Sequence, residues 1–225
     1  MSIKAVVFDL DDTLYPEIDY VKSGFSEVGK QLEKRFGIKS AYQKLFDFFR
    51  IDKNDVYGRL LRDCKISFNE SDIDDLIEIY RTHKPKLTLS CEVKETLSTL
   101  SLKGLKLGII TDGRPHQQWA KIQALDLDKL VDKIIVTDEL GGIEFRKPNP
   151  IAFEKMCIEF NIQPSDMVYV GDNPKKDFAV KKYLPIKTVQ IMSGLYQNEE
   201  YLDGFKPNIL IDYLPNLLGI DFNKI

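Results

Sequence analysis

The sequence predicts an α/β protein with a doubly wound parallel sheet and a small all-helical domain inserted after the first strand. Two observations lead to this prediction. Short, continuously apolar runs alternate with helical patterns along most of the chain, as expected for parallel strands that are covered on both faces. The interval from residue 15 to residue 86 instead carries helical patterns only.

The predicted strands are short apolar runs in which β-branched residues are common, and they are too short to be helices. They cover residues 5–8, 107–110, 134–136, 167–170, 188–191 and 209–211. Helical patterns follow the second run, at 117–125, and precede the fourth, at 150–160. This alternation of strand and helix favours the doubly wound arrangement.

The inserted domain begins with an amphipathic helix. Its apolar residues recur at spacings of four, three, four and four, which is one face of a helix; they are Val21, Phe25, Val28, Leu32 and Phe36. Further helices are predicted over 42–49, 56–61 and 72–81, and Ser71 or Asp72 is expected to cap the last of them.

Prolines mark the two crossings between the predicted domains. Pro16 and Pro85 lie near them and stiffen the chain there. We therefore expect a core domain made of residues 1–15 and 87–225, and a helical domain made of residues 16–86.

Composition excludes several classes of protein. The chain has 225 residues with 32 Lys and Arg against 35 Asp and Glu, a net charge of −3. This ordinary globular mixture excludes a disordered chain, a fibrous repeat and a disulfide scaffold. It provides no basic field for nucleic acid, and no apolar stretch approaches the length of a membrane span. The apolar run at 5–8 is also too short for a signal peptide. We expect a cytoplasmic monomer or homodimer with no nucleic-acid or membrane partner.

The cysteines agree with this compartment. Cys64, Cys91 and Cys157 are odd in number, far apart and without a CxxC pair. Zinc ribbons and thioredoxin-like chemistry are therefore not expected, and we predict reduced, buried thiols.

Carboxylates follow the first predicted strand. Asp9, Asp11 and Asp12 come directly after an apolar run, where they repel one another and are poorly solvated. In an open parallel sheet, ligands bind beyond the carboxyl ends of the strands, and a bound cation would relieve the repulsion. Taken alone, the segment is also compatible with a solvated acidic turn.

A second acidic pair follows the fourth predicted strand. Gly171 allows a tight exit from that strand, and Asp172 and Asp177 follow it. Two strands that deliver carboxylates to one edge of a sheet build an oxygen-rich site, which suits Mg²⁺.

Two further segments add groups that suit an anion. Thr111, Asp112 and Gly113 follow the second predicted strand and provide a hydroxyl and backbone N–H groups at a helix entrance. Lys147 is followed directly by Pro148, which restrains its backbone. Each feature is ordinary by itself, but the four segments in this order indicate a site for a phosphate and a cation.

These four segments resemble the motifs of the haloacid dehalogenase-like hydrolases, and the resemblance covers essentially the whole chain. It implies a Rossmann-like core of about five parallel strands. It also implies that the helical insert is a cap domain of the kind found in the first subfamily of these enzymes.

The resemblance implies a Mg²⁺-dependent phosphatase that acts on a small phosphorylated metabolite. Asp9 would be the nucleophile that forms an aspartyl-phosphate, and Asp11 the general acid and then the general base. Thr111, with Asp112 and Gly113, would bind the phosphate, and Lys147 would offset the charges of Asp9 and of the phosphoryl oxygens.

The same resemblance implies a metal site. Mg²⁺ would be held by Asp9, Asp11 through its backbone carbonyl, and Asp172, while Asp177 would support the metal from behind these ligands or through water.

Other functions remain open. A phosphomutase of the β-phosphoglucomutase type uses the same aspartyl-phosphate. A haloacid dehalogenase is less favoured, because a halide leaving group needs no acid at the position of Asp11. A binding protein that keeps the fold without catalysis is also less favoured. The roles of Arg114 and His116 are undecided.

Overall fold

The computed structural model describes residues 3–224. Residues 1, 2 and 225, which the predicted core domain includes, lie outside the described residues. The chain divides into a helical unit, Ile18–Leu87, and an α/β unit made of Met1–Glu17 and Thr88–Ile225. Each unit is described by itself.

The α/β unit contains a parallel sheet of six strands within residues 3–224, in the order β3-β2-β1-β4-β5-β6. The strands are β1 (Ala5–Phe8), β2 (Lys106–Thr111), β3 (Lys133–Val136), β4 (Met167–Gly171), β5 (Lys187–Ile191) and β6 (Ile209–Ile211). Every apolar run predicted as a strand is a strand, and the fold class is confirmed. The sheet has one strand more than the resemblance implied.

The strand order places the site. The chain winds outward from β1 through β2 to β3, and then from β4 through β5 to β6, so the order reverses between β1 and β4. Phe8 at the end of β1 pairs with Ile109 of β2 and with Val170 of β4. The residues that follow β1, β2 and β4 therefore leave the sheet at one edge, where doubly wound sheets bind their ligands.

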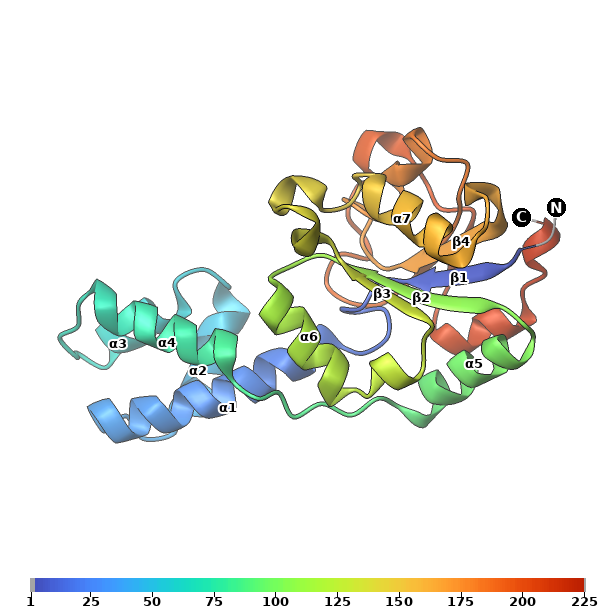
Figure 1. The fold of residues 1–225 in the computed structure, drawn as a ribbon. Coiled ribbons are helices and arrows are strands. Elements are labelled where there is room, and N and C mark those ends of the chain that lie inside the picture. The colour runs from blue at the N-terminus through green and yellow to red at the C-terminus, as the bar shows by residue number, and fades with distance from the viewer. Residues whose placement is uncertain (1–2, 225) are drawn as a thin grey trace. The chain divides into compact units, whose positions relative to one another are not determined.

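Helices cover both faces of the sheet. In Figure 1, α5 (Cys91–Leu102) and α6 (Pro115–Ala124) lie on one face, and α7 (Ile151–Phe160) lies on the other. A Cβ on Gly108 of β2 would lie 2.9 Å from the sulfur of Met156, so this glycine lets α7 approach the sheet. Helices α6 and α7 agree with the predicted segments.

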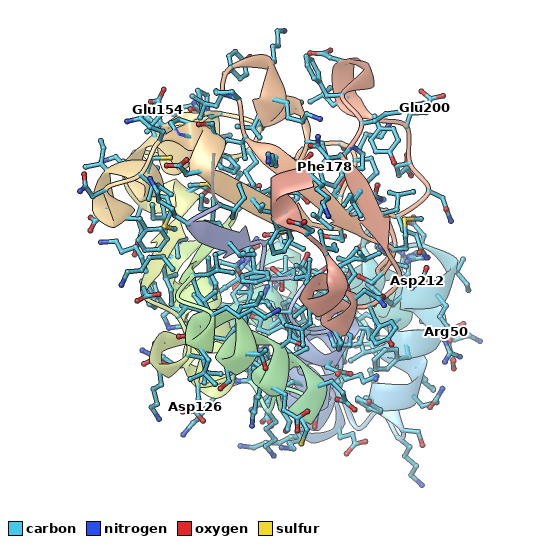
Figure 2. The ribbon with its side chains drawn as sticks, turned by 90° about the vertical axis from the view of Figure 1, so that its right-hand side faces the viewer. Arg50, Asp126, Glu154, Phe178, Glu200 and Asp212 are labelled. Carbon is cyan, nitrogen blue, oxygen red and sulfur yellow. The ribbon has the colours of Figure 1, made fainter. Side chains whose placement is uncertain are left out.

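The interior of the unit is apolar. Figure 2 shows Phe178 inside it, and this residue has no exposed surface, whereas Asp126 and Glu154 lie on the outside. Short 3₁₀ segments complete the chain; they are Leu127–Lys129, Thr137–Leu140, Ile143–Phe145, Pro164–Asp166, Ala179–Lys182, Leu202–Gly204, Leu214–Gly219 and Phe222–Lys224.

Helix α5 was not predicted. Its buried residues Thr96, Leu97 and Leu100 form a narrow face in a segment that is otherwise rich in serine, threonine and charge. The hydroxyl of Ser90 accepts a hydrogen bond from the backbone N–H of Val93 and caps the helix. Ser90 therefore marks the start of this helix in the sequence, whereas the spacing of its apolar residues does not.

The helical unit consists of most of α1 (Glu17–Phe36) with α2 (Ala41–Ile51), α3 (Val56–Asp63) and α4 (Glu70–Thr82). The four predicted helices are confirmed. Phe25 of α1 packs at its centre, with ring centroids 5.2 Å from Phe46 and 5.6 Å from Phe49.

The predicted cap of α4 is wrong. Asn69 is the N-cap, because its side-chain oxygen accepts from the N–H of Asp72 at 3.1 Å. Asp72 in turn accepts from the N–H of Asn69 at 3.0 Å, which forms a capping box. The helix therefore begins before Ser71, and Asp72 is the reciprocal partner of the cap.

The prediction of buried cysteines holds for one position. Cys157 is buried, and burial raises the pKa of its thiol to about 11. Cys91, the first residue of α5, is exposed, and Cys64 is partly buried. None of the helices described over residues 3–224 has the length and apolar character that a membrane span requires.

The capping box gives a first prediction. Asn69→Ala removes the side chain that accepts from Asp72 N–H, and we expect a loss of about 1 kcal/mol in the free energy of unfolding of the helical unit. Ser71→Ala is the matched control and should change it by less than about 0.5 kcal/mol, because Ser71 is exposed inside the helix. Urea unfolding followed by circular dichroism measures both. Equal effects of the two substitutions would contradict the assignment of the cap.

Candidate active site

A pocket of about 370 Å³ opens at the sheet edge where β1, β2 and β4 end. All of its lining residues belong to the α/β unit. They are Asp9, Asp11, Asp12, Glu17, Asp112, Arg146, Lys147, Asp172, Asn173, Lys176 and Tyr196. The structure thus brings five of the sequence-predicted site residues together: Asp9, Asp11, Asp112, Lys147 and Asp172.

Asp9 is fixed at the end of β1. Its N–H donates to the carbonyl of Val170 at 2.8 Å, which continues the pairing with β4, and the residue is 1% exposed. Its Oδ1 lies 2.8 Å from Nζ of Lys147, and its Oδ2 lies 3.4 Å from Nζ of Lys176. Burial by itself raises the pKa of Asp9, but the charges of these lysines outweigh burial and hold the pKa below its ordinary value. Asp9 is therefore a buried, ionised carboxylate.

Lys147 lies beneath Asp9. Besides Asp9 Oδ1, its Nζ contacts Oδ1 of Asp177 at 2.8 Å and donates to the hydroxyl of Tyr169 at 2.7 Å. That hydroxyl donates to Asp177 at 3.2 Å. Burial lowers the pKa of Lys147, but the charges of Asp177 and Asp9 reverse this effect and raise it. Lys147 is therefore a charged side chain in the interior.

Asp9, Asp172 and Asp177 form a buried acidic cluster. One carboxylate oxygen from each lies within 4.8 Å of the others. Burial, with the charges of Asp177 and Asp9, raises the pKa of Asp172 to about 9. Burial also raises the pKa of Asp177. This concentration of carboxylate oxygens fits a hard divalent cation such as Mg²⁺, which would compensate the repulsion.

Gly171 allows this arrangement. A Cβ at this position would lie 2.5 Å from Oδ2 of Asp177, so only glycine lets the loop fold back beneath β4. The N–H of Asn173 donates to the same oxygen at 2.9 Å and holds Asp177 in place.

Asp11 lies in a different environment. Both of its oxygens contact Nζ of Lys121, at 2.8 and 2.9 Å. Tyr15 donates its hydroxyl to Oδ1 at 2.5 Å, and Gln118 donates to Oδ2 at 3.1 Å. The carboxylate of Asp11 is thus bound by donors from α6 and from its own loop.

Thr111 and Asp112 end β2. Gln118 donates to Oγ1 of Thr111 at 2.5 Å and to the carbonyl of Asp112 at 3.0 Å. Thr111 is 1% exposed and is not among the residues that line the pocket. The carboxylate of Asp112 accepts from Thr137 at 2.9 Å and from the N–H of Lys147 at 3.1 Å, and so ties the end of β2 to the lysine loop.

Gly113 follows with φ +134°, in the region that favours glycine. Hydrogen bonds from Arg146 to the carboxylate of Asp138 are the main cause of the low pKa of that residue. A hydrogen bond from the backbone N–H of Gly113 to Asp138 lowers it further. Arg114 and His116 are exposed.

Glu17 lies on the pocket wall at the start of α1. Burial, with the charge of Asp11, raises the pKa of Glu17 to about 7. Asp12 accepts from the N–H of Glu17 at 2.8 Å and so holds the first turn of the helix.

Sequence reasoning missed several residues of the site. Gln118 and Lys121 lie one turn apart on α6, whose apolar pattern attracted attention instead. Their spacing of three places them on one face of the helix, but spacing alone does not show that this face turns toward Asp11. Tyr169 lies inside an apolar strand, where it has the appearance of a core residue. Lys176 directly precedes Asp177, and only the aspartate belongs to the predicted motif.

Curated relatives match nearly the whole chain. A glyceraldehyde 3-phosphate phosphatase from Pyrococcus furiosus is 32% identical over 97% of this chain and 92% of its own length. A protein of the same name from Methanocaldococcus jannaschii is 29% identical, over 96% and 98%. A pyrophosphatase PpaX from Anoxybacillus flavithermus is 28% identical, over 98% and 97%.

Solved structures share the fold. A putative β-phosphoglucomutase from Thermotoga maritima has a TM-score of 0.67 at 18% identity, over 96% of this chain and 99% of that chain. A 2-haloacid dehalogenase from Pseudomonas syringae has a TM-score of 0.63 at 21% identity, over 96% and 97%. The model of the haloacid dehalogenase-like hydrolases matches residues 6–191, a span that contains every lining residue of the pocket except Tyr196. The chain belongs to the haloacid dehalogenase-like hydrolase family.

Proposed function

We propose that this enzyme is a Mg²⁺-dependent phosphatase that hydrolyses small phosphate monoesters through a phosphorylated Asp9. The observation that carries the proposal is the ionised, buried carboxylate of Asp9, which Lys147 holds at the sheet edge beside Asp172 and Asp177. Asp9, Asp172 and the backbone carbonyl of Asp11 would hold Mg²⁺, with Asp177 behind them. When bound, the cation neutralises charge on the phosphoryl oxygens.

In the first step, a carboxylate oxygen of Asp9 forms a bond to phosphorus as the bond to the ester oxygen breaks. Lys147 keeps the nucleophile in place, and the hydroxyl of Thr111 donates to a phosphoryl oxygen. Asp11, in its protonated form, gives its proton to the departing alkoxide, which leaves as an alcohol. The product of this step is a phosphorylated Asp9.

In the second step, Asp11 takes a proton from water as the water oxygen attacks phosphorus. The bond between phosphorus and Asp9 breaks, which releases inorganic phosphate and restores the carboxylate. Lys121, Tyr15 and Gln118 donate to Asp11 and so hold its carboxylate in position for this role.

The substrate class follows from the relatives and from the pocket. Relatives named for glyceraldehyde 3-phosphate and pyrophosphate support a small phosphorylated compound, and a pocket of about 370 Å³ suits one. We also propose that residues 16–86 act as a cap domain that excludes water during the first step.

The nucleophile gives a second prediction. Asp9→Asn removes the attacking carboxylate, and we expect phosphate release to fall by more than about 1,000-fold. The assay measures phosphate from a panel that includes glyceraldehyde 3-phosphate and pyrophosphate, with and without Mg²⁺. Asp126→Asn, an exposed position of the same unit, is the control and should keep full activity.

Two outcomes would count against the function. Equal activity of the wild type and Asp9→Asn would exclude the proposed nucleophile. Conversion of a sugar 1-phosphate to the 6-phosphate without net phosphate release would indicate a mutase.

Asp11 gives a third prediction, based on the leaving group. 4-Nitrophenolate leaves without a proton, whereas an alkoxide requires one, so Asp11→Asn should spare the first step with 4-nitrophenyl phosphate only. Stopped-flow measurements should then show a burst of about one nitrophenolate per enzyme and a slow steady state, because water lacks its base. With an alkyl phosphate we expect activity to fall by about 100- to 10,000-fold without a burst. Equal losses on both esters and no burst would contradict the role.

The acidic cluster gives a fourth prediction. Asp172→Asn removes a carboxyl group that burial and its acidic neighbours prevent from ionising at neutral pH, which costs folding free energy. The metal-free variant should therefore melt higher than metal-free wild type at pH 7, by about 2–4 °C for each kcal/mol of this cost that is removed. Mg²⁺ at 100 times its Kd should stabilise the wild type by about 2.7 kcal/mol and the variant by much less. Differential scanning fluorimetry with an EDTA control measures both. A Mg²⁺ response that survives the substitution would exclude Asp172 as a ligand.

A further inference from the structure

We propose that Lys176 contributes an ammonium group, in addition to that of Lys147, to the binding of the substrate's phosphoryl group. This inference deepens the proposed phosphatase function and rests on it. It concerns a lysine that the sequence motifs did not single out.

The ammonium group of Lys147 is enclosed by oxygen atoms. Three oxygen atoms lie within 2.8 Å of its Nζ: Oδ1 of Asp9, Oδ1 of Asp177 and the hydroxyl of Tyr169. Among the residues that the structure describes, the contact with Tyr169 is a hydrogen bond, and those with the two carboxylates are ion pairs. The side chain of Lys147 is 0% exposed. Its Nζ is therefore less accessible from the pocket than that of Lys176, whose side chain is 28% exposed.

The surroundings of Lys176 differ. Its Nζ lies 3.4 Å from Oδ2 of Asp9 and 3.5 Å from Oδ2 of Asp112, and its side chain is 28% exposed at the pocket. Charge-assisted hydrogen bonds between an ammonium and a carboxylate are normally about 2.7–2.9 Å long. These longer contacts neutralise charge without saturating the donors. Lys176 therefore retains the capacity to bind another anion.

The orientation of the Asp9 carboxylate indicates where the phosphoryl group would lie. Because Oδ1 of Asp9 faces Lys147, Oδ2 is the oxygen left to attack phosphorus. A phosphoryl group on Oδ2 occupies the space beside that atom, and Nζ of Lys176 borders this space.

The loop after β4 explains why this lysine, and not its neighbour, faces the pocket. The N–H groups of Lys176 and Asp177 both donate to the carbonyl of Asn173, at 3.2 and 3.0 Å, which forms a tight turn. The turn sends Asp177 beneath the sheet edge and Lys176 to the pocket. Lys175 is half exposed and pairs with Glu199 at 3.5 Å. It provides a matched control with the same charge one residue away.

The experiment measures inorganic phosphate binding by isothermal titration calorimetry, with full-length protein and saturating MgCl₂. We expect Lys176→Met to weaken phosphate binding by about 10- to 100-fold and to raise the inhibition constant of phosphate equally. Lys176→Arg should restore most of the affinity, because it keeps the charge. Lys175→Met should bind phosphate as the wild type does.

Mg²⁺ binding without phosphate separates a substrate contact from a merely structural role. Removal of a cation beside Asp9 should leave Mg²⁺ affinity unchanged or increase it, so a variant that loses Mg²⁺ and phosphate together would overturn the proposal. Equal phosphate affinity in Lys176→Met and wild type would overturn it as well. These results are distinct from failure of the phosphatase function, in which the wild type itself neither hydrolyses any ester of the panel nor binds phosphate; that result would overturn both.

Discussion

The ion pair between Lys147 and Asp9 is the interaction on which the rest of the site depends. Both side chains are almost completely removed from solvent, and burial of an uncompensated charge costs several kcal/mol. Each charge therefore requires the other, and Asp177 and Tyr169 complete the surroundings of the lysine. This pairing explains how a carboxylate remains ionised, as the proposed nucleophile must be, at the bottom of a crevice that other carboxylates line.

The sheet provides the framework for this pair. β1 lies between β2 and β4 and pairs in register with both, so the residues that leave these strands emerge side by side. Asp9 follows β1, and Asp172 follows β4. Lys147 comes from a loop that Asp112, at the end of β2, holds in place. The carboxylate of Asp112 accepts a hydrogen bond from the backbone N–H of Lys147. Residues far apart in the sequence thus meet because parallel strands end at a common edge.

This geometry also explains how much the sequence could predict. Strand ends are visible as apolar runs followed by polar residues, so the strands and the residues after them, such as Asp9 and Asp172, were accessible to sequence reasoning. Tyr169 was not, since a tyrosine within a strand is indistinguishable from a core residue until its hydroxyl is found beside Lys147. Nor was Lys121, because an amphipathic helix gives no sign of which charged residue turns inward. Helix α5 and the cap at Asn69 were missed for a related reason, as polar hydrogen bonds define them more than apolar periodicity does.

Asp9 and Asp11 show how two carboxylates of one short segment come to differ. Asp9 continues the pairing of β1 and enters the interior, where Lys147 and Lys176 compensate its charge. Asp11 lies beyond the strand, with its side chain 20% exposed, and donors from α6 and Tyr15 bind it. The first environment suits a group that must attack in its ionised form and is shielded from water. The second suits the proposed acid and base, because its side chain is partly exposed to solvent. Such a separation of environments allows one residue type to serve as nucleophile and as acid–base catalyst.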